Sequence, residues 1–456
     1  MVAAAVIVAT YAGAWYGDFQ FDDFHSILEN PHLERWQTFI GHLDHMVRPV
    51  LYASFFADRS LYGASPTGYH VLNLLFHLGS GFLIYRILVR AVGEELRYVP
   101  FWTALLFLIH PITTETVTYI SGRATGLMGF LYLLALAFYI EATASQRERV
   151  PSRMYLFGAL LSFVLAIGSK ETAMTLPFAL PLWDILVRRL DRAEFRQRFF
   201  SCHLPFWSVL FAVAAWAWWH PRYSTLVQFS FDSRPFWDNL LSELHAGMYS
   251  LWLLVAPWQQ SFDHDLPLLR SWTEWPVPVD LPLFAGLMAA MWLAIRRLPL
   301  VSFGLAWYWL QVSPMMLIPR NDLLSERNLY LASFGIVLVC VVVLFHFVHA
   351  VTKACTRPAW IRTAASVVAV AVVLAFSLAT VQRNTLYRDP FLLWSDAVNK
   401  APQKARPHNN LGHIYAERRD WEEAIVHFRM AAQLDPEYRV AQDNLRDAYL
   451  HQVGRR

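Results

Sequence analysis

The sequence predicts an all-α membrane protein, a polytopic bundle of about eleven transmembrane helices followed by a short helical repeat domain. Of its 456 residues, 56% are apolar and only 16% are charged, whereas soluble proteins average about 45–50% apolar and about 25% charged residues. Aromatic residues make up 15% of the chain, and Trp and Tyr concentrate at membrane interfaces. After residue 381 the composition changes to a polar, helical pattern.

This composition excludes a disordered chain, a small secreted scaffold and an ordinary cytosolic enzyme. The three cysteines, Cys202, Cys340 and Cys355, are too few for a disulfide framework. A net charge of +3 gives no reason to expect a nucleic-acid partner. The chain has no Asn-x-Ser/Thr sequence, which suggests a bacterial source.

A helix needs about 20 mostly apolar residues to cross a hydrocarbon core of about 30 Å, because each residue rises about 1.5 Å. Eleven segments are apolar enough to be candidates. They are 2–17, 69–90, 99–110, 122–140, 154–169, 172–187, 204–219, 281–295, 300–318, 329–351 and 363–381.

The loops between these segments differ in their content of Lys and Arg. Basic residues are about four times denser in loops 86–98, 141–154, 187–199, 296–299 and 352–363 than in the opposite set. Because cytoplasmic loops carry the excess of Lys and Arg, we expect this set and the amino terminus to lie inside. Loop 18–68 and everything after residue 381 then lie outside, on the periplasmic side of a bacterial inner membrane.

Two segments allow a second interpretation. Segment 237–257 is apolar but carries Asp238, Glu243 and His245, so we expect it to be re-entrant or interfacial. Residues 2–17 could be a cleaved signal peptide, but no Lys or Arg precedes the apolar stretch, which favours a retained first helix.

The chain divides into a membrane domain, 1–381, whose first outer loop is 18–68, and an extracytoplasmic domain, 382–456. Two stretches of the second domain match at an offset of 34 residues, pairing Trp394 with Phe428 and Pro402 with Pro436. A period of 34 residues is typical of tetratricopeptide repeats. About two repeats are too few for independent stability, so the tail is expected to pack against the membrane domain. It would bind a protein or peptide; a generic helical cap is the alternative.

Asp22 and Asp23 follow the first apolar segment, in FQFDDFHSILENPHL, with phenylalanines on both sides. Two adjacent carboxylates repel one another, so the pKa of one should rise. A carboxylate with a raised pKa can act as a general base. A helix cap or a solvated loop acid is the alternative.

Further charged residues occur between apolar segments on the same predicted side. His110, Glu115 and Arg123 fall in HPITTETVTYISGRATGL, and Lys170 and Glu171 fall in GSKETAMTLP. Charges held at a membrane surface are costly unless they face a polar cavity. For Lys170 and Glu171, the alternative is that they merely neutralise each other.

Asp263 belongs to an acidic cluster with His264 and Asp265, in SFDHDLP. A carboxylate–imidazole–carboxylate triple is compatible with a divalent ion, but neighbouring residues in an extended loop point in different directions. A solvated turn is the simpler interpretation, and we expect no required metal.

Glu326 and Arg327 fall in DLLSERNLYLASFG, where the chain re-enters the membrane, and Arg48 lies in the first outer loop. An Arg at the outer surface can pair with a phosphate; snorkelling, or a pair with Glu326, is the alternative. Acids and cations thus gather at one mouth of an apolar bundle. A base that activates a hydroxyl and cations that hold a phosphate leaving group are what glycosyl transfer from a lipid phosphate needs.

Six motifs occur in one order along the chain: FDDFHSILENPHL, HPITTETVTYISGRATGL, GSKETAMTLP, SFDHD, SERNLYL and ARPHNNLGHIYAERRDWEEAIVHF. As an ordered set they resemble the transmembrane and tetratricopeptide-repeat O-mannosyltransferases and their bacterial relatives, within the GT-C glycosyltransferase superfamily. The repeat array here is shorter than in the animal members of that family.

The resemblance implies inverting transfer of a hexose, expected to be mannose, from a polyprenyl-phosphate-linked donor to a protein hydroxyl outside the membrane. Asp22 or Asp23 would be the general base. The cations for the donor phosphate would be Arg327, Arg123, Lys170 and Arg48. Other polar residues of the cavity would be His110, Glu115, Glu171, Asp263 and Glu326. The lipid-linked sugar is the substrate, no cofactor is required, and membrane lipids and an acceptor held by the repeats are the expected partners.

Two alternatives stay open from the sequence. The acceptor could be a lipid or an envelope glycan, although tetratricopeptide repeats more often hold peptides. The chain could also be a transporter or a scaffold for the repeats, but a transporter would place charges near the bilayer midplane and show internal symmetry.

Overall fold

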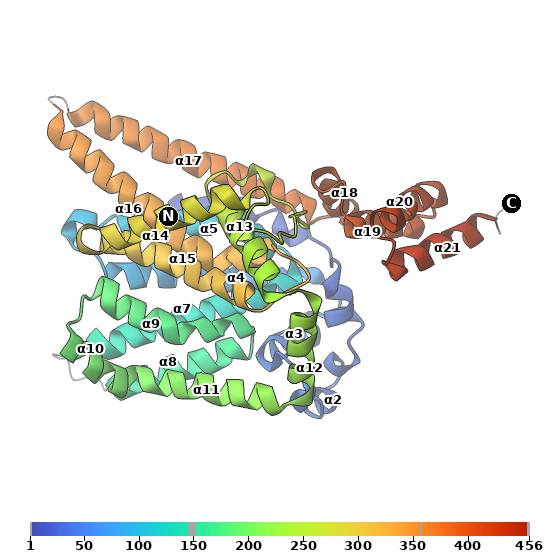
Figure 1. Ribbon diagram of the computed structural model, residues 1–456, viewed down its shortest axis with the longest axis horizontal. Helices are drawn as coiled ribbons and strands as arrows, with labels where there is room; N and C mark the ends of the chain where they lie inside the picture. Colours follow the sequence, from blue (N-terminus) through green and yellow to red (C-terminus); the bar gives the residue numbers. More distant parts are fainter. Residues whose placement is uncertain (1, 145–151, 356–357, 454–456) are drawn as a thin grey trace.

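The computed structural model describes residues 2–144, 152–355 and 358–453, and every regular element in these ranges is a helix (Figure 1). The chain is an integral membrane protein of the predicted all-α class. Within these ranges, seven helical segments are long and apolar enough to cross a membrane. They are Pro66–Val89, Ile120–Ala144, Arg192–Trp219, Val277–Arg297, Pro299–Leu317, Glu326–Ala354 and Ala359–Leu386.

All eleven predicted segments contain helix, but four of the helices are shorter than a span of typical length. The 11 residues of α5 would rise only about 16 Å, roughly half the hydrocarbon core. The segment expected at 172–187 is helical throughout but changes type, from a 3-10 turn at Glu171–Thr175 through α9 to a π-helical turn at Trp183–Val187, so its regular α-helical part is short. The expected count of eleven therefore exceeds the seven spans that length supports. The four short helices are α1 (Val2–Tyr11), α5 (Val99–Ile109), α8 (Ser152–Ile167) and α9 (Leu176–Leu182).

The long helices pack side by side in the bundle, with α7 along α8, α15 along α16, and α4 against α5 and α7. Gly304 of α15 and Gly335 of α16 allow the closest approach, because a Cβ on Gly304 would lie 2.5 Å from the backbone oxygen of Gly335. Small residues at such crossings let two helix backbones touch. The long helices are α4 (Pro66–Val89), α7 (Arg123–Ala144), α14 (Val277–Arg297), α15 (Pro299–Leu317), α16 (Tyr330–Ala354) and α17 (Pro358–Leu386), and α11 (Leu204–Trp219) is the last part of the long helical segment Arg192–Trp219.

The two ends of the bundle differ. At the left of Figure 1 lie α10 (Arg192–Arg198), the last turn of α16 and the first turn of α17. These belong to the loops rich in Lys and Arg. At the right lie the repeat tail and the helices of the outer loops. Those helices are α2 (Trp36–Ile40), α3 (Pro49–Tyr62), α6 (Thr114–Val117) and α12 (Pro221–Ser233).

The charged segment 237–257 forms helix α13 (Phe236–Val255), which packs against α14 and α15. It is not one of the seven candidate spans. His245 on this helix contacts Asp280 of α14, with 3.0 Å between Nδ1 and Oδ2. Its re-entrant or interfacial placement stays a prediction.

The tail contains one complete helix pair with one further helix on either side. Helices α19 and α20 pack closely, since a Cβ on Gly412 would lie 2.8 Å from the ring of Phe428. The 34-residue period therefore corresponds to one full repeat and two flanking helices in the structure. The tail helices are α18 (Pro390–Lys400), α19 (Ala405–Glu417), α20 (Trp421–Leu434) and α21 (Arg439–Val453).

The tail is docked on the membrane domain, as expected. Lys404 and Arg406 reach the buried carboxylate of Asp263, at 2.6 and 2.5 Å. Next to this contact, the ring of Phe262 meets Trp394 of α18 edge-on, with 5.3 Å between ring centroids. Asp263, expected to be a polar residue of the active cavity, is paired with the tail in this structure, and its place in a cavity stays a prediction.

Candidate active site

The charged residues of the outer end come from four loops that are distant in the sequence. These are the first outer loop, the turn after α5, the turn between α8 and α9, and the loop between α15 and α16. Each loop connects helices packed in the bundle, and ion pairs between side chains of different loops bring the charged residues together.

Asp22 and Arg327 lie together at this end, with 3.9 Å between Oδ2 and Nη1. The Asp22 side chain is 44% exposed and that of Arg327 is 29% exposed. On its inner side, Arg327 is held by buried Glu115, whose Oε2 accepts a 2.9 Å hydrogen bond from the Arg327 backbone N–H. Burial raises the pKa of Glu115 and the Arg327 guanidinium opposes the rise. The backbone of Arg327 is thus fixed by Glu115, while its side chain remains partly accessible to solvent.

Tyr119 completes this group, although the sequence analysis did not select it. Its phenol oxygen accepts a hydrogen bond from the backbone N–H of Asp22 at 3.1 Å. The guanidinium of Arg327 lies 5.7 Å from the centre of its ring, a distance that allows a cation–π attraction. Burial, with the nearby carboxylates of Asp23 and Asp22, raises the pKa of Tyr119. The sequence offered one indication of Tyr119: it lies four residues after Glu115, in the same motif.

Asp23 lies in a different environment from its neighbour Asp22. It is fully buried, and its Oδ2 accepts from the backbone N–H of Gln20 at 2.8 Å. Its Oδ1 accepts from the backbone N–H of Ser121 at 2.8 Å and from the Ser121 hydroxyl. Burial raises the pKa of Asp23 to about 7, and repulsion by Asp22 is the smallest cause named. The predicted rise therefore occurs, but burial rather than repulsion is its main cause.

The backbone at Phe21 explains how two adjacent acids differ so much. Phe21 has a φ of +40°, a conformation that costs energy for a residue with a bulky side chain. This turn leaves Asp22 partly exposed while Asp23 is enclosed. Such strained backbone is often found at functional sites.

A second charged group is centred on Glu171. Its carboxylate accepts from Arg48, with Nη2 at 2.9 and 3.0 Å and Nε at 3.1 Å. Arg320 adds a contact of 2.6 Å from Nη2 to Oε1. Burial opposes ionisation of Glu171, but the two guanidinium groups hold its pKa below the usual range. Arg320 was missed in the sequence, although it lies in the same outer loop as Arg327.

Lys170 does not pair with Glu171. Its ammonium donates to Thr125 Oγ1 and Asn328 Oδ1, both at 2.7 Å. The side chain is nearly fully buried, and burial, together with neighbouring arginines, lowers its pKa far below the usual range. Lys170 is thus held inside the protein by Thr125 and Asn328, and its expected contact with the donor phosphate stays a prediction.

Arg123 is also not available to a phosphate, contrary to expectation. Its guanidinium is fully buried and lies 2.5 Å from Asp58 of α3. It donates further hydrogen bonds to the side chain of Asn73 and the backbone oxygen of Tyr69, at 2.7 and 2.9 Å. Because all its partners are internal, Arg123 joins the first outer loop to α4 and α7.

His110 and Glu326 were expected to line the cavity, and both are buried instead. His110 bonds through Nε2 to the backbone oxygen of Leu254 at 2.8 Å, and its Nδ1 accepts from the N–H of Ile112. Glu326 accepts from the backbone N–H of Ser261 at 2.6 Å. Its other partners are Gln260, His264 and Arg383. Their roles in this structure are to hold loops together.

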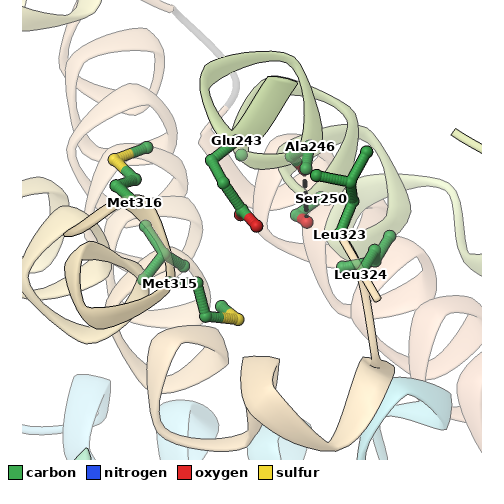
Figure 2. A pocket seen from close by; sticks show the side chains of 9 residues that line it. Glu243, Ala246, Ser250, Met315, Met316, Leu323 and Leu324 are labelled. Atoms are coloured by element: carbon green, nitrogen blue, oxygen red, sulfur yellow. Dashed lines mark hydrogen bonds between the residues drawn. The ribbon is translucent and has the colours of Figure 1, made fainter. Parts of the chain in front are cut away.

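A small hollow lies between α13 and α15, below the loop that carries Arg327 (Figure 2). It has room for about one water molecule. Glu243 points into it and its Oε1 has no hydrogen-bond partner, while Met315 and Met316 form much of the opposite wall. Burial raises the pKa of Glu243 to about 8, although Arg234 and Arg320 oppose the rise.

In the described part of the chain, no three His, Cys, Asp or Glu side chains converge as metal ligands would. In the SFDHD motif, Asp263 contacts Lys404 and Arg406, whereas His264 contacts Glu326. The carboxylate–imidazole–carboxylate triple considered from the sequence is therefore not assembled.

Comparisons with known proteins agree with this architecture. Residues 405–438 match the family model of the tetratricopeptide repeat. The chain is 23% identical to protein O-mannosyl-transferase F38B6.6 of Caenorhabditis elegans, over 96% of this chain and 63% of that protein. It is 26% identical to human protein O-mannosyl-transferase TMTC1, over 95% of this chain and 55% of that protein. For human TMTC4 the identity is 27%, over 94% of this chain and 65% of that protein.

Among solved structures, ArnT from Cupriavidus metallidurans bound to undecaprenyl phosphate aligns with a TM-score of 0.43 and 13% identity, covering 88% of this chain and 79% of that chain. The curated relatives are longer, and the chain spans between 55% and 65% of their length in the comparisons above. Over nearly its whole length the chain is nevertheless similar to the transmembrane and tetratricopeptide-repeat protein O-mannosyl-transferases, the family that its ordered motifs predicted.

Proposed function

We propose that the chain is an inverting membrane glycosyltransferase that moves a hexose from a polyprenyl-phosphate-linked donor to a Ser or Thr hydroxyl of a protein. The single observation that carries this proposal is the pairing of the half-exposed carboxylate of Asp22 with Arg327, 3.9 Å away, at one end of an apolar bundle. Mannose is the hexose suggested by the names of the relatives.

Asp22 is the general base in this proposal. The acceptor hydroxyl oxygen attacks the anomeric carbon of the donor, its proton passes to Asp22, and the bond between that carbon and the phosphate oxygen breaks. A single displacement inverts the anomeric centre. Asp23 is unsuited to this step, because both its oxygens are already occupied by Gln20 and Ser121.

The leaving phosphate gains negative charge as the bond breaks, and cations fixed near it lower the barrier. Three partly exposed arginines at the outer end suit this role: Arg327, Arg48 and Arg320. The guanidinium fork matches phosphate oxygens in pairs. Because these arginines can stabilise the negative charge of the phosphate, the proposed mechanism includes no metal ion.

Two further features support the proposed sidedness and acceptor. Helix α10 and the adjoining ends of α16 and α17, which belong to the Lys- and Arg-rich loops, lie at the end of the bundle away from the tail (Figure 1), which supports an extracytoplasmic site in a bacterial inner membrane. The docked repeat tail supports a protein or peptide acceptor, because such repeats form peptide-binding surfaces.

Asp22→Asn tests the proposed base in the full-length protein, reconstituted with a synthetic polyprenyl-phosphate hexose and Ser/Thr peptides. We expect sugar transfer to fall by about 10²- to 10⁴-fold, the usual contribution of a general base. Asp18→Asn is the matched control, because Asp18 is an exposed acid of the same loop that bonds only to the next backbone N–H. Full activity of the Asp22 variant would refute the assignment.

The acceptor class is tested in cells. Mass spectrometry of envelope proteins and lipids from a strain lacking the gene should show a hexose missing from defined Ser or Thr residues. Loss of hexose from a lipid or glycan alone would reject the protein acceptor while leaving the donor chemistry in place.

A further inference from the structure

We propose that Glu171 is a resident counter-ion of the donor-phosphate site, which competes with lipid phosphate for Arg48 and Arg320 and so weakens the hold on the phosphate product. This inference rests on the proposed function and adds a role that the sequence did not assign. It concerns a carboxylate at a place where a phosphate would be expected.

The geometry of the group supports a replaceable anion. Arg48 grips Glu171 through both Nε and Nη2, and Arg320 approaches the same carboxylate from another loop. This fork binds carboxylate and phosphate oxygens with similar geometry. All three side chains are about one third exposed, at 31%, 33% and 36% for Arg48, Arg320 and Glu171. An anion arriving from the outside can therefore reach the same guanidinium groups.

The two arginines are held in place by contacts that do not involve Glu171. The backbone N–H of Val50, two residues after Arg48, donates to the backbone oxygen of Gly168 at 3.0 Å. The backbone oxygen of Arg320 accepts from Arg234 Nη2 at 3.0 Å. The backbone at both arginines should therefore keep its place when another anion replaces Glu171, so that both guanidinium groups can still reach the same site.

The charges of the group explain why a competing carboxylate would be useful. Two guanidinium groups face one carboxylate, and Lys170 is the neighbouring amine. The remaining positive charge suits the single charge of a sugar phosphodiester. The product is a phosphate monoester with a charge of about −1.5 to −2, which two unopposed arginines would hold strongly. A carboxylate that returns to the arginines favours release of this product.

Other groups around the cluster do not supply the same competition. Glu243 is close enough to Arg320 to be affected by its charge, but it faces the hollow between α13 and α15. Tyr223 of α12 lies near Glu171, and its hydroxyl donates to the backbone oxygen of Val47 at 2.6 Å. Among these neighbours, Glu171 is the carboxylate in direct contact with both arginines.

Binding of undecaprenyl phosphate to the full-length protein in nanodiscs tests the proposal. Glu171→Gln keeps the shape of the side chain and removes its charge, so affinity should rise on the order of tenfold. Glu171→Asp keeps the charge on a shorter side chain that cannot reach both arginines, so it should give a smaller rise. Glu29→Gln is the control, because Glu29 is an exposed acid of the first outer loop that pairs with His25.

Undecaprenol and inorganic phosphate separate the contributions of the lipid tail and the free anion. The Glu171→Gln effect should be absent with undecaprenol, and it should be present but weaker with inorganic phosphate. If the wild type binds undecaprenyl phosphate and neither Glu171 variant binds it more tightly, the counter-ion role is refuted and the proposed function stands. If the wild type binds it no better than undecaprenol, the phosphate site itself is refuted.

Discussion

Arg406 of the repeat tail donates hydrogen bonds of 2.7 and 2.5 Å to the two carboxylate oxygens of Asp263, a buried residue of the outer loop before α14. Burial opposes ionisation of Asp263, but Arg406 and Lys404 hold its pKa below the usual range. The tail is therefore attached to the membrane domain by a desolvated ion pair as well as by aromatic packing.

Replacing Arg406 with Ala should loosen this joint. Breaking a buried ion pair typically costs about 3–5 kcal/mol, and a smaller loss is expected here because Lys404 still contacts Asp263. Limited proteolysis should show faster cleavage between α17 and α19, and the thermal midpoint should fall. Arg439→Ala, at an exposed position on α21, is the control. Equal protection of both variants would show that the ion pair does not fasten the tail.

Arg123 is predicted to stabilise the fold and to play no part in phosphate binding. Arg123→Ala leaves Asp58 without its cation in a buried site, so stability should fall by about 3–5 kcal/mol. Arg90→Ala removes an exposed pair with Glu141 and should cost at most about 1 kcal/mol. Thermal unfolding in detergent distinguishes the two. Loss of lipid-phosphate binding by an Arg123→Lys protein of normal stability would contradict this structural role.

Because α15 and α16 cross closely at Gly304, we expect one added methyl group at this position to destabilise the protein. Gly304→Ala would force the two backbones apart, and overpacking of this kind typically costs about 1–3 kcal/mol. Gly286→Ala in α14 is a matched control, because nothing lies within 4 Å of its Cβ position. That control should be neutral or slightly stabilising, since Ala is the better helix former. Similar melting of the two variants would refute the close contact.

Glu243 predicts a dependence of stability on pH. Its pKa is raised from 4.5 to about 8 by burial, so between these values the folded protein retains a proton that the unfolded chain has lost. Stability should therefore decrease as pH rises from about 4.5 to 8, by at most about 1.4 kcal/mol per pH unit from this group. Glu243→Gln should remove this contribution and be more stable than the wild type above pH 8. If the stability of the wild type and of the Glu243→Gln variant changed with pH in the same way, the predicted contribution of Glu243 would be contradicted.

The sequence was sufficient for the fold class and for the identity of the repeat. Apolar runs and the 34-residue period are local patterns, so they predicted the membrane bundle and the tail without any tertiary information. In the described part of the chain, seven helices are long and apolar enough to span a membrane, and the expected count of eleven stays a prediction.

The sequence also located the candidate site in part. It singled out Asp22, Arg327 and Arg48, which are partly exposed in the structure and form ion pairs between different loops. It missed Arg320 and Tyr119, whose importance depends on which residues they meet. It also placed Arg123 and Lys170 in the site, since a cation near a loop looks the same in sequence whether it is exposed or paired inside.

What the sequence determined by itself is thus the hydrophobic segments, the helical repeat and the set of ionisable residues between them. Only the tertiary structure decided that Asp22 is accessible while Asp23 is enclosed, and that Glu171 rather than an open space lies between two arginines. The physical reason is that hydropathy and periodicity are properties of short stretches of chain. Solvent exposure and charge pairing are instead set by residues as far apart in the sequence as Asp22 and Arg327, which meet only when the helices pack.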